Sequence, residues 1–302
     1  MVDAFAGAGG MSSAALSPRQ RAEQLSAALP PLLLHAERVA ASVAQGVHGR
    51  RRVGQGEAFW QFRDYQPGDS PQSIDWRQTA KADRVFVRQM EWEAAQSVWC
   101  WRDGSASMDW RSSNKLPTKR ERAELLLLAL MTLMIRAGEH VSLLGTGLPP
   151  AANRGTLVRL SEILRREDPA EARDLPAPEP LPRYGQVLLL GDFLADPQEI
   201  ERSLRGFAER GVKGHLVQVL DPAEETLPYS GRVRFEGLQG ERPWLLSRAE
   251  GVRTQYRDQL AAQMDAIREI ARRTGWRCTW HRTDRSPQTA LLSVYSALAH
   301  QL

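Results

Sequence analysis

The chain reads Ser-Val-Trp-Cys-Trp-Arg-Asp-Gly-Ser-Ala-Ser-Met from Ser97 to Met108, and this stretch decides how the rest is interpreted. Its first half is apolar and aromatic, which favours a buried β-strand. Asp103, Ser105 and Ser107 follow at alternate positions, so a tight loop can point one carboxylate and two hydroxyls at a common centre. Hard oxygen donors of this kind suit Mg²⁺ or Mn²⁺. The stretch therefore predicts a strand that ends in a divalent-cation site.

Strand-like and helix-like segments alternate on the C-terminal side of this loop. We expect strands at 140–144, 186–190, 214–220 and 276–281, a small hairpin at 233–246, and helices at 117–137, 155–166, 196–210, 248–274 and 287–300. Such alternation predicts a doubly wound, mainly parallel α/β sheet. Sheets of this class bind ligands beyond the carboxyl ends of their strands. Asp103, Asp192 and Asp221 would all lie on that edge.

The part of the chain before the loop divides into a tail and an extension. Residues 1–18 are small, polar and glycine-rich, which predicts a disordered tail. Residues 19–95 are expected to hold a helix, interrupted at Pro30-Pro31, and then a β-containing extension. Residues 96–302 would form the α/β domain.

A charged turn motif lies in this extension. It reads Phe-Arg-Asp-Tyr-Gln-Pro-Gly-Asp at 62–69 and is followed by Ile-Asp-Trp at 74–76. The central Pro-Gly pair fits a type II turn. Because charge clusters are frequently structural, we interpret the motif as a structural signature, with a docking surface as the alternative. Its residues are Arg63, Tyr65, Pro67, Gly68, Asp69, Asp75 and Trp76.

This signature, and its distance from the Asp-x-Ser-x-Ser loop, resembles a bacterial family, the domain-of-unknown-function family fifty-eight. Its members carry Arg-x-Tyr-x-Pro-Gly-Asp followed by Ile-Asp-Trp, and the resemblance covers roughly residues 50–300. It implies a domain like von Willebrand factor A (vWA). This domain would act as an adaptor or chaperone-like partner of a MoxR-type AAA+ ATPase. Many members have transmembrane helices before the signature. This sequence shows none there, so the resemblance implies a cytosolic version.

The Asp-x-Ser-x-Ser loop itself resembles the metal-ion-dependent adhesion site of von Willebrand factor A (vWA) domains. That resemblance implies a threonine from a second loop and an aspartate from a third, for which Thr156 and Asp192 are the candidates. Thr156 fits an ordinary helix N-cap equally well. The implied site holds Mg²⁺ or Mn²⁺ and leaves one position open for an acidic side chain of a partner. The alternative is a metal-free turn in which Asp103 and the serines cap backbone N–H groups.

Two other functions stay open as alternatives. A hydrolase could use Ser105 or Ser107, although Ser107 stands where a Gly-x-Ser-x-Gly elbow has its second glycine. A nucleic-acid-binding protein could use the basic runs at 50–52 and 272–273. Against that reading, the net charge is only +4, from 40 basic and 36 acidic residues that are largely interspersed.

Composition is that of an ordinary globular protein. The 302 residues are 42% hydrophobic, enough for a sizeable core. The chain has only two cysteines, Cys100 and Cys278, which favours a reducing compartment over a disulfide scaffold. Neither a secretory signal nor a membrane-spanning run is recognisable. We therefore expect a cytoplasmic protein.

Overall fold

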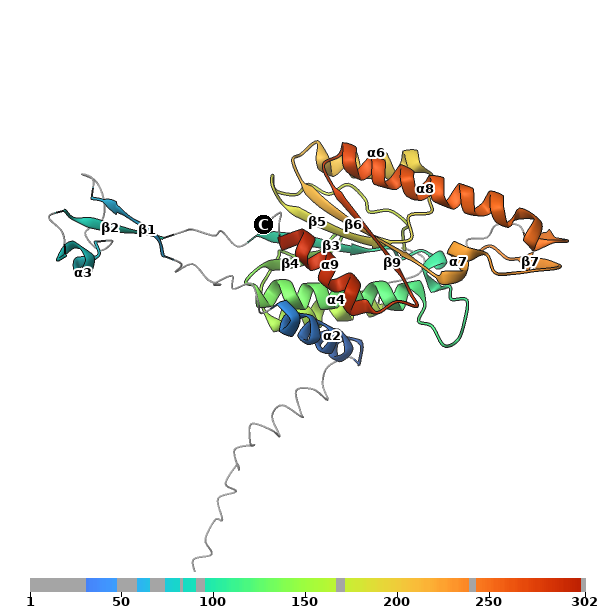
Figure 1. Cartoon of the computed structure of the whole chain (residues 1–302), viewed down its shortest axis with the longest axis horizontal. Coiled ribbons are helices and arrows are strands. Elements are labelled where there is room, and N and C mark those ends of the chain that lie inside the picture. The colour runs from blue at the N-terminus through green and yellow to red at the C-terminus, as the bar shows by residue number, and fades with distance from the viewer. Residues whose placement is uncertain are drawn as a thin grey trace, which may run out of the picture.

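The centre of the molecule is a five-stranded sheet (Figure 1). The computed structural model describes residues 31–47, 59–65, 74–81, 84–90, 96–166, 172–238 and 243–299. The sheet has the order β4-β3-β5-β6-β9, and every neighbouring pair in it is parallel. Its strands are β3 (Ser97–Arg102), β4 (His140–Leu143), β5 (Gln186–Gly191), β6 (Lys213–Leu220) and β9 (Arg277–Arg282).

The strand order reverses once, between β3 and β5. The chain leaves β3 through helix α4 (Lys119–Arg136) and adds β4 on one side, and then β5, β6 and β9 are added on the other. This is a doubly wound α/β sheet, so the predicted fold class is confirmed. The carboxyl ends of β3 and β5 diverge in their connections at this point, which is where such sheets bind ligands.

Helices cover both faces of the sheet (Figure 1). One face carries α2 (Pro31–Val47), α4, α5 (Arg154–Arg166) and α9 (Pro287–Ala299), whose apolar side chains form one core with the sheet. The other face carries α6 (Pro197–Ala208) and α8 (Arg253–Arg273). Helix α4 begins at a capping box in which Thr118 and Glu121 each accept a hydrogen bond from the other's backbone N–H. Its middle is buried all round, as its apolar sequence predicts.

Helix α2 belongs to the core of the sheet domain. Leu33, Ala36 and Val39 are buried, and they pack in the cluster that contains α4 and α9. The boundary predicted at 95–96 had assigned this helix to the extension. In the structure the apolar stripe of α2 packs against α4 and α9. The predicted tail at 1–18 lies outside the described residues.

The extension contains a short antiparallel pair, β1 (Phe59–Asp64) with β2 (Phe86–Met90), and helix α3 (Trp76–Thr79). Asp75 caps α3 by accepting a hydrogen bond from Gln78 N, and Tyr65 N donates to Val85 O. The signature residue Asp75 therefore has a structural role, while Trp76 is exposed. Arg63 lies on β1. The predicted turn with Pro67, Gly68 and Asp69 lies outside the described residues.

Five short elements lie near the carboxyl edge of the sheet. They are the 3-10 turn η2 (Ala106–Asp109), helix α7 (Pro222–Thr226), the antiparallel pair β7 (Val233–Phe235) with β8 (Trp244–Leu246), and the 3-10 turn η3 (Ala249–Val252). The β7–β8 pair agrees with the hairpin predicted at 233–246. Strand β7 supplies one wall of the site described next.

Candidate functional site

The loop after β3 folds its three predicted oxygen ligands toward one another. Asp103 is fully buried, and its Oδ1 accepts a hydrogen bond from Ser105 N at 2.8 Å. The hydroxyls of Ser105 and Ser107 lie 2.9 Å apart. Ser107 Oγ in turn donates to Asp192 Oδ2 at 2.7 Å. The structure thus brings four of the five predicted ligands together at the point where the strand order reverses.

The end of β5 is shaped to admit this loop. A Cβ atom on Gly191 would lie 2.9 Å from Asp103 Cβ, so only glycine allows the two segments to approach this closely. Phe193, which follows the site aspartate, has a φ of 49°, a left-handed conformation that is unusual for an aromatic residue. Gln263 of α8 donates to Phe193 O at 2.9 Å, and Gln218 of β6 donates to Asp192 O at 2.9 Å. These contacts hold the loop that presents Asp192.

The fifth component of the cluster is Lys119, which the sequence analysis did not single out. Lys119 is the first residue of α4 and is completely buried. Its Nζ donates to Asp192 Oδ2 at 2.8 Å and to Glu224 Oε1 at 2.5 Å. A sequence signal was present, because a lysine in the first turn of a helix opposes the helix dipole and needs a compensating charge.

Glu224 is held in place by the capping box of α7. Its Oε2 accepts from Asp221 N at 2.8 Å, and Asp221 Oδ1 accepts from Ala223 N at 2.8 Å. Asp221 Oδ2 also accepts from Ser112 N at 3.0 Å. Asp221 therefore lies on the predicted edge, but as a cap of α7 that ties this helix to the segment before α4.

Thr156 lies elsewhere. Its N–H and its hydroxyl both donate to Asn153 Oδ1, in the first turn of α5. After β4 the chain runs back along the strand, since Ala151 pairs antiparallel with Val141, which is level with Val98 near the start of β3. Thr156 thus follows a segment that leads away from the carboxyl edge. Thr156 is the third residue of α5 and donates to Asn153, so it is not the N-cap that the sequence offered as the alternative.

Burial and charge set the protonation of the cluster. Burial and the nearby Asp192 carboxylate together raise the pKa of Asp103 to about 7, against the opposing effect of the hydrogen bonds from Ser105. Burial alone would lower the pKa of Lys119, but Asp192 and Glu224 together raise it above its ordinary value. Lys119 therefore stays an ammonium ion at neutral pH, while the Asp103 carboxyl is close to its midpoint.

The hydrogen bonds of the cluster decide whether its oxygen atoms can bind a divalent cation. Asp103 Oδ2 is buried without a hydrogen-bond partner among the described residues, which would suit a ligand atom. Asp192 Oδ2, however, already accepts from Ser107 and from the Lys119 ammonium. A dication on that oxygen would face a buried positive charge across it. The residues present do not fit Mg²⁺ or Mn²⁺ beside a charged Lys119.

A groove of about 750 Å³ opens above this cluster. Its floor includes Ser107, Asp192 and Glu224. Its walls are largely apolar and aromatic, and they come from the loops after β3, β5 and β6, from β7 and from α8: Trp110, Leu194, Leu227, Tyr229, Phe235, Leu238 and Tyr256. Such a combination of apolar walls and a few polar groups is typical of a binding site.

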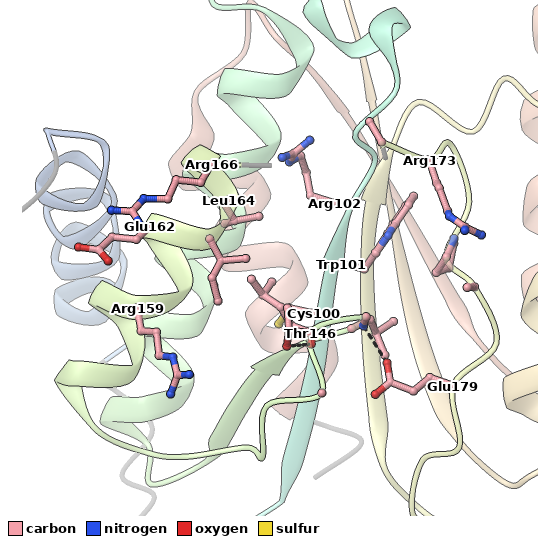
Figure 2. Close-up of a pocket in the computed structure, with 18 of the residues that line it drawn as sticks. Cys100, Trp101, Arg102, Thr146, Arg159, Glu162, Leu164, Arg166, Arg173 and Glu179 are labelled. Carbon is pink, nitrogen blue, oxygen red and sulfur yellow. Dashed lines mark hydrogen bonds between the residues drawn. The ribbon is translucent and has the colours of Figure 1, made fainter. Parts of the chain in front are cut away.

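A second hollow, of about 1240 Å³, lies beside the carboxyl end of β3 (Figure 2). Figure 2 shows Trp101 and Arg102 leaving β3 on opposite sides, with Arg159 and Arg166 along α5 and Arg173 across from them. The buried Arg102 is committed within the fold, since its Nη1 donates to Asp103 O at 3.0 Å and its Nη2 lies 3.2 Å from Glu124 Oε1. Arg102 therefore supports the loop of the site. The lining of this hollow is more basic than that of the groove.

The comparisons with known proteins agree with the signature. A family described as "Protein of unknown function DUF58" matches residues 61–266, which is more than half of the chain. The chain belongs to this family. Proteins similar to this chain include uncharacterized proteins of Mycobacterium tuberculosis (Rv1480) and Mycobacterium bovis (Mb1516). Each is 28% identical to this chain over 230 residues, which are 72% of this chain and 71% of the relative.

Two solved structures were also found to be similar to this DUF58 protein. A conserved hypothetical protein, BatB from Bacteroides thetaiotaomicron, is 15% identical, with a TM-score of 0.40 over 68% of this chain and 100% of that chain. The SpRpn10 VWA domain is 10% identical, with a TM-score of 0.33 over 67% of this chain and 95% of that one. In the part of the chain that the structure describes, no helix is both long and apolar enough to cross a membrane.

Proposed function

We propose that this DUF58 protein is a non-catalytic, vWA-like interaction protein that binds a partner in the aromatic groove at the carboxyl edge of its sheet. The observation that carries the proposal is the groove itself. Aromatic side chains surround a rigid polar floor at the point where the strand order reverses. Aromatic anchors that enclose a few fixed polar groups are typical of the centres of protein interfaces.

The hydrogen bonds of the floor favour docking over catalysis. Ser107 donates to a carboxylate that also binds Lys119, and Lys119 is held as an ammonium ion, so it is no general base for a serine. The two histidines that are buried among the described residues have other partners: His215 contacts Thr279, and His281 contacts Arg122. Burial lowers the pKa of each to about 4. Among the described residues no histidine contacts Ser105 or Ser107, so no contact supports the hydrolase alternative.

The nucleic-acid alternative is not supported by the basic pair at the end of α8. Arg272 donates twice to Glu269, and Arg273 lies 3.4 Å from Glu201. Both guanidinium groups therefore belong to ion pairs on a solvated helix face. The other basic run, at 50–52, lies outside the described residues.

The partner that we propose is a MoxR-type AAA+ ATPase, with this protein as its adaptor. This step rests on membership of the family and on the partnership that the resemblance implies. A cytoplasmic location follows from the same proposal, and the free thiols of Cys100 and Cys278 suit a reducing compartment.

Placing a charge on the rim of the groove should weaken capture of the ATPase without harming the fold. Leu194 and Leu238 line the groove and are 43% and 50% exposed. We expect Leu194→Asp and Leu238→Asp each to weaken binding by about tenfold or more, because a charge would be desolvated in an apolar contact. Biolayer interferometry with the purified MoxR-type ATPase of the same organism, with ATP and with ADP, measures this.

Leu292→Asp is the matched control. Leu292 is also 43% exposed, but it lies on α9, which is not part of the groove. Its variant should bind like the unchanged protein, and all three variants should keep the wild-type melting temperature. Equal binding by all four proteins would reject the groove as the docking site. Absence of binding by the unchanged protein would reject this ATPase as the partner.

A further inference from the structure

We propose that the Lys119 ammonium is the built-in cation of this site, standing where a metal-ion-dependent adhesion site would hold a divalent metal. The site accordingly takes no Mg²⁺ or Mn²⁺. This inference rests on the geometry of the cluster and does not require the docking partner proposed above. It replaces the metal-bridged contact expected from the sequence.

The position of Lys119 carries the first part of the argument. Its Nζ bridges Asp192, at the end of β5, and Glu224, in the first turn of α7 after β6. The same Asp192 oxygen also accepts a hydrogen bond from the hydroxyl of Ser107, in the loop after β3. One ammonium thus joins the loops of three neighbouring strands. That is the structural task that a metal ion performs when its ligands come from separate loops.

The charge of the cluster carries the second part. Asp192 and Glu224 are two carboxylates in a buried setting, with side-chain exposures of 5% and 15%. Without a cation between them they would repel each other. The ammonium lies within hydrogen-bonding distance of both and removes that repulsion. A dication added to the same oxygens would gain little attraction and would meet a fixed positive charge.

The cost of burying Lys119 carries the third part. A lysine side chain that is 1% exposed has lost its hydration, and its place in the first turn of α4 opposes the helix dipole. Removing one member of a buried ion pair is strongly destabilising, because the remaining charge is left unpaired. The two carboxylates offset the free-energy cost of burying the Lys119 charge, and Lys119 offsets the cost of burying the two carboxylates. The three groups form one unit that is complete without metal.

The inference changes what a partner meets at the floor of the groove. With a bound dication, an acidic side chain of the partner would complete the coordination sphere. With Lys119 already shared by two carboxylates, the floor offers no open coordination position. Partner contacts then depend on the aromatic walls and on hydrogen bonds to Ser107.

Metal titration of the unchanged protein and of Lys119→Met tests the inference. Calorimetry with MgCl₂ and with MnCl₂ should give no binding heat for the unchanged protein up to millimolar metal, and EDTA should leave its melting temperature unchanged. Lys119→Met keeps the length and apolar stem of the side chain but removes its charge. It should melt about 10 °C lower, and millimolar Mn²⁺ or Mg²⁺ should restore part of that loss.

Two further variants make the result decisive. Lys115→Met, at an exposed lysine shortly before the same helix, should behave like the unchanged protein. Lys119→Arg keeps the charge and should melt well above Lys119→Met without responding to metal. A saturable Mn²⁺ or Mg²⁺ isotherm for the unchanged protein that is lost in Asp103→Asn would overturn the inference, even if Lys119→Met does not fold. So would a Lys119→Met protein with a wild-type melting temperature.

Discussion

Replacing Leu127 with aspartate is expected to prevent the protein from folding. Leu127 is fully buried in α4, the helix that packs against the sheet, α2 and α9. Truncating such a leucine costs about 2–5 kcal/mol, and burying an unpaired carboxylate in its place adds several kcal/mol more. Because domains are stable by only about 5–15 kcal/mol, the sum should abolish the native state.

Circular dichroism and urea unfolding of the purified protein measure this effect. Leu292→Asp serves again as the control, because this leucine is 43% exposed on α9 and its replacement should change the free energy of unfolding by less than about 1 kcal/mol. A Leu127→Asp protein that unfolds at nearly the wild-type urea concentration would mean that α4 is not buried against the sheet.

Gly214→Ala is expected to be unusually costly for the addition of one methyl group. A Cβ atom at this position of β6 would lie 2.1 Å from Cδ2 and Cε3 of Trp276, well inside contact distance. The indole cannot easily move, since it is 4% exposed, its Nε1 donates to Val212 O at 3.1 Å, and it packs against Phe207. Overpacking of this kind costs about 1–3 kcal/mol or more.

A double-mutant cycle with Trp276→Leu separates this clash from other effects. The smaller side chain leaves room for the new methyl group, so Gly214→Ala should cost much less in the Trp276→Leu background, although Trp276→Leu is itself destabilising. Gly251→Ala is the control, because no atom lies within 4 Å of a Cβ built there. Equal costs of Gly214→Ala in both backgrounds would contradict the packing of Trp276 on β6.

The docking proposal and the lysine inference can fail separately. Capture that is lost in the groove variants, combined with a metal isotherm for the unchanged protein, would keep the groove and restore the metal-bridged contact. Unaffected capture, combined with the expected absence of metal binding, would move the docking surface elsewhere and leave Lys119 as the cation of the cluster. The two sets of measurements therefore report on different features of the same edge.

Local sequence patterns were sufficient for the fold class and for half of the geometry of the site. Apolar runs that alternate with amphipathic or apolar helices predict a parallel sheet, because each pattern depends only on neighbours in the chain. Parallel strands of one sheet end at one edge, so an aspartate just after β3 and another just after β5 had to lie on the same side. That rule predicts that Asp103 and Ser107 lie near Asp192, and in the structure Ser107 donates to Asp192.

Only the tertiary structure decided which charged groups complete the cluster. Lys119 lies 73 positions before Asp192 and 105 before Glu224 in the chain, and no local pattern records that its side chain reaches both. Thr156 fitted a family pattern, yet the chain after β4 turns back and carries it to a helix start. The physical reason is common to both cases. The pairing of buried charges depends on how helices and loops pack across the whole domain, whereas secondary structure depends on residues close together in sequence.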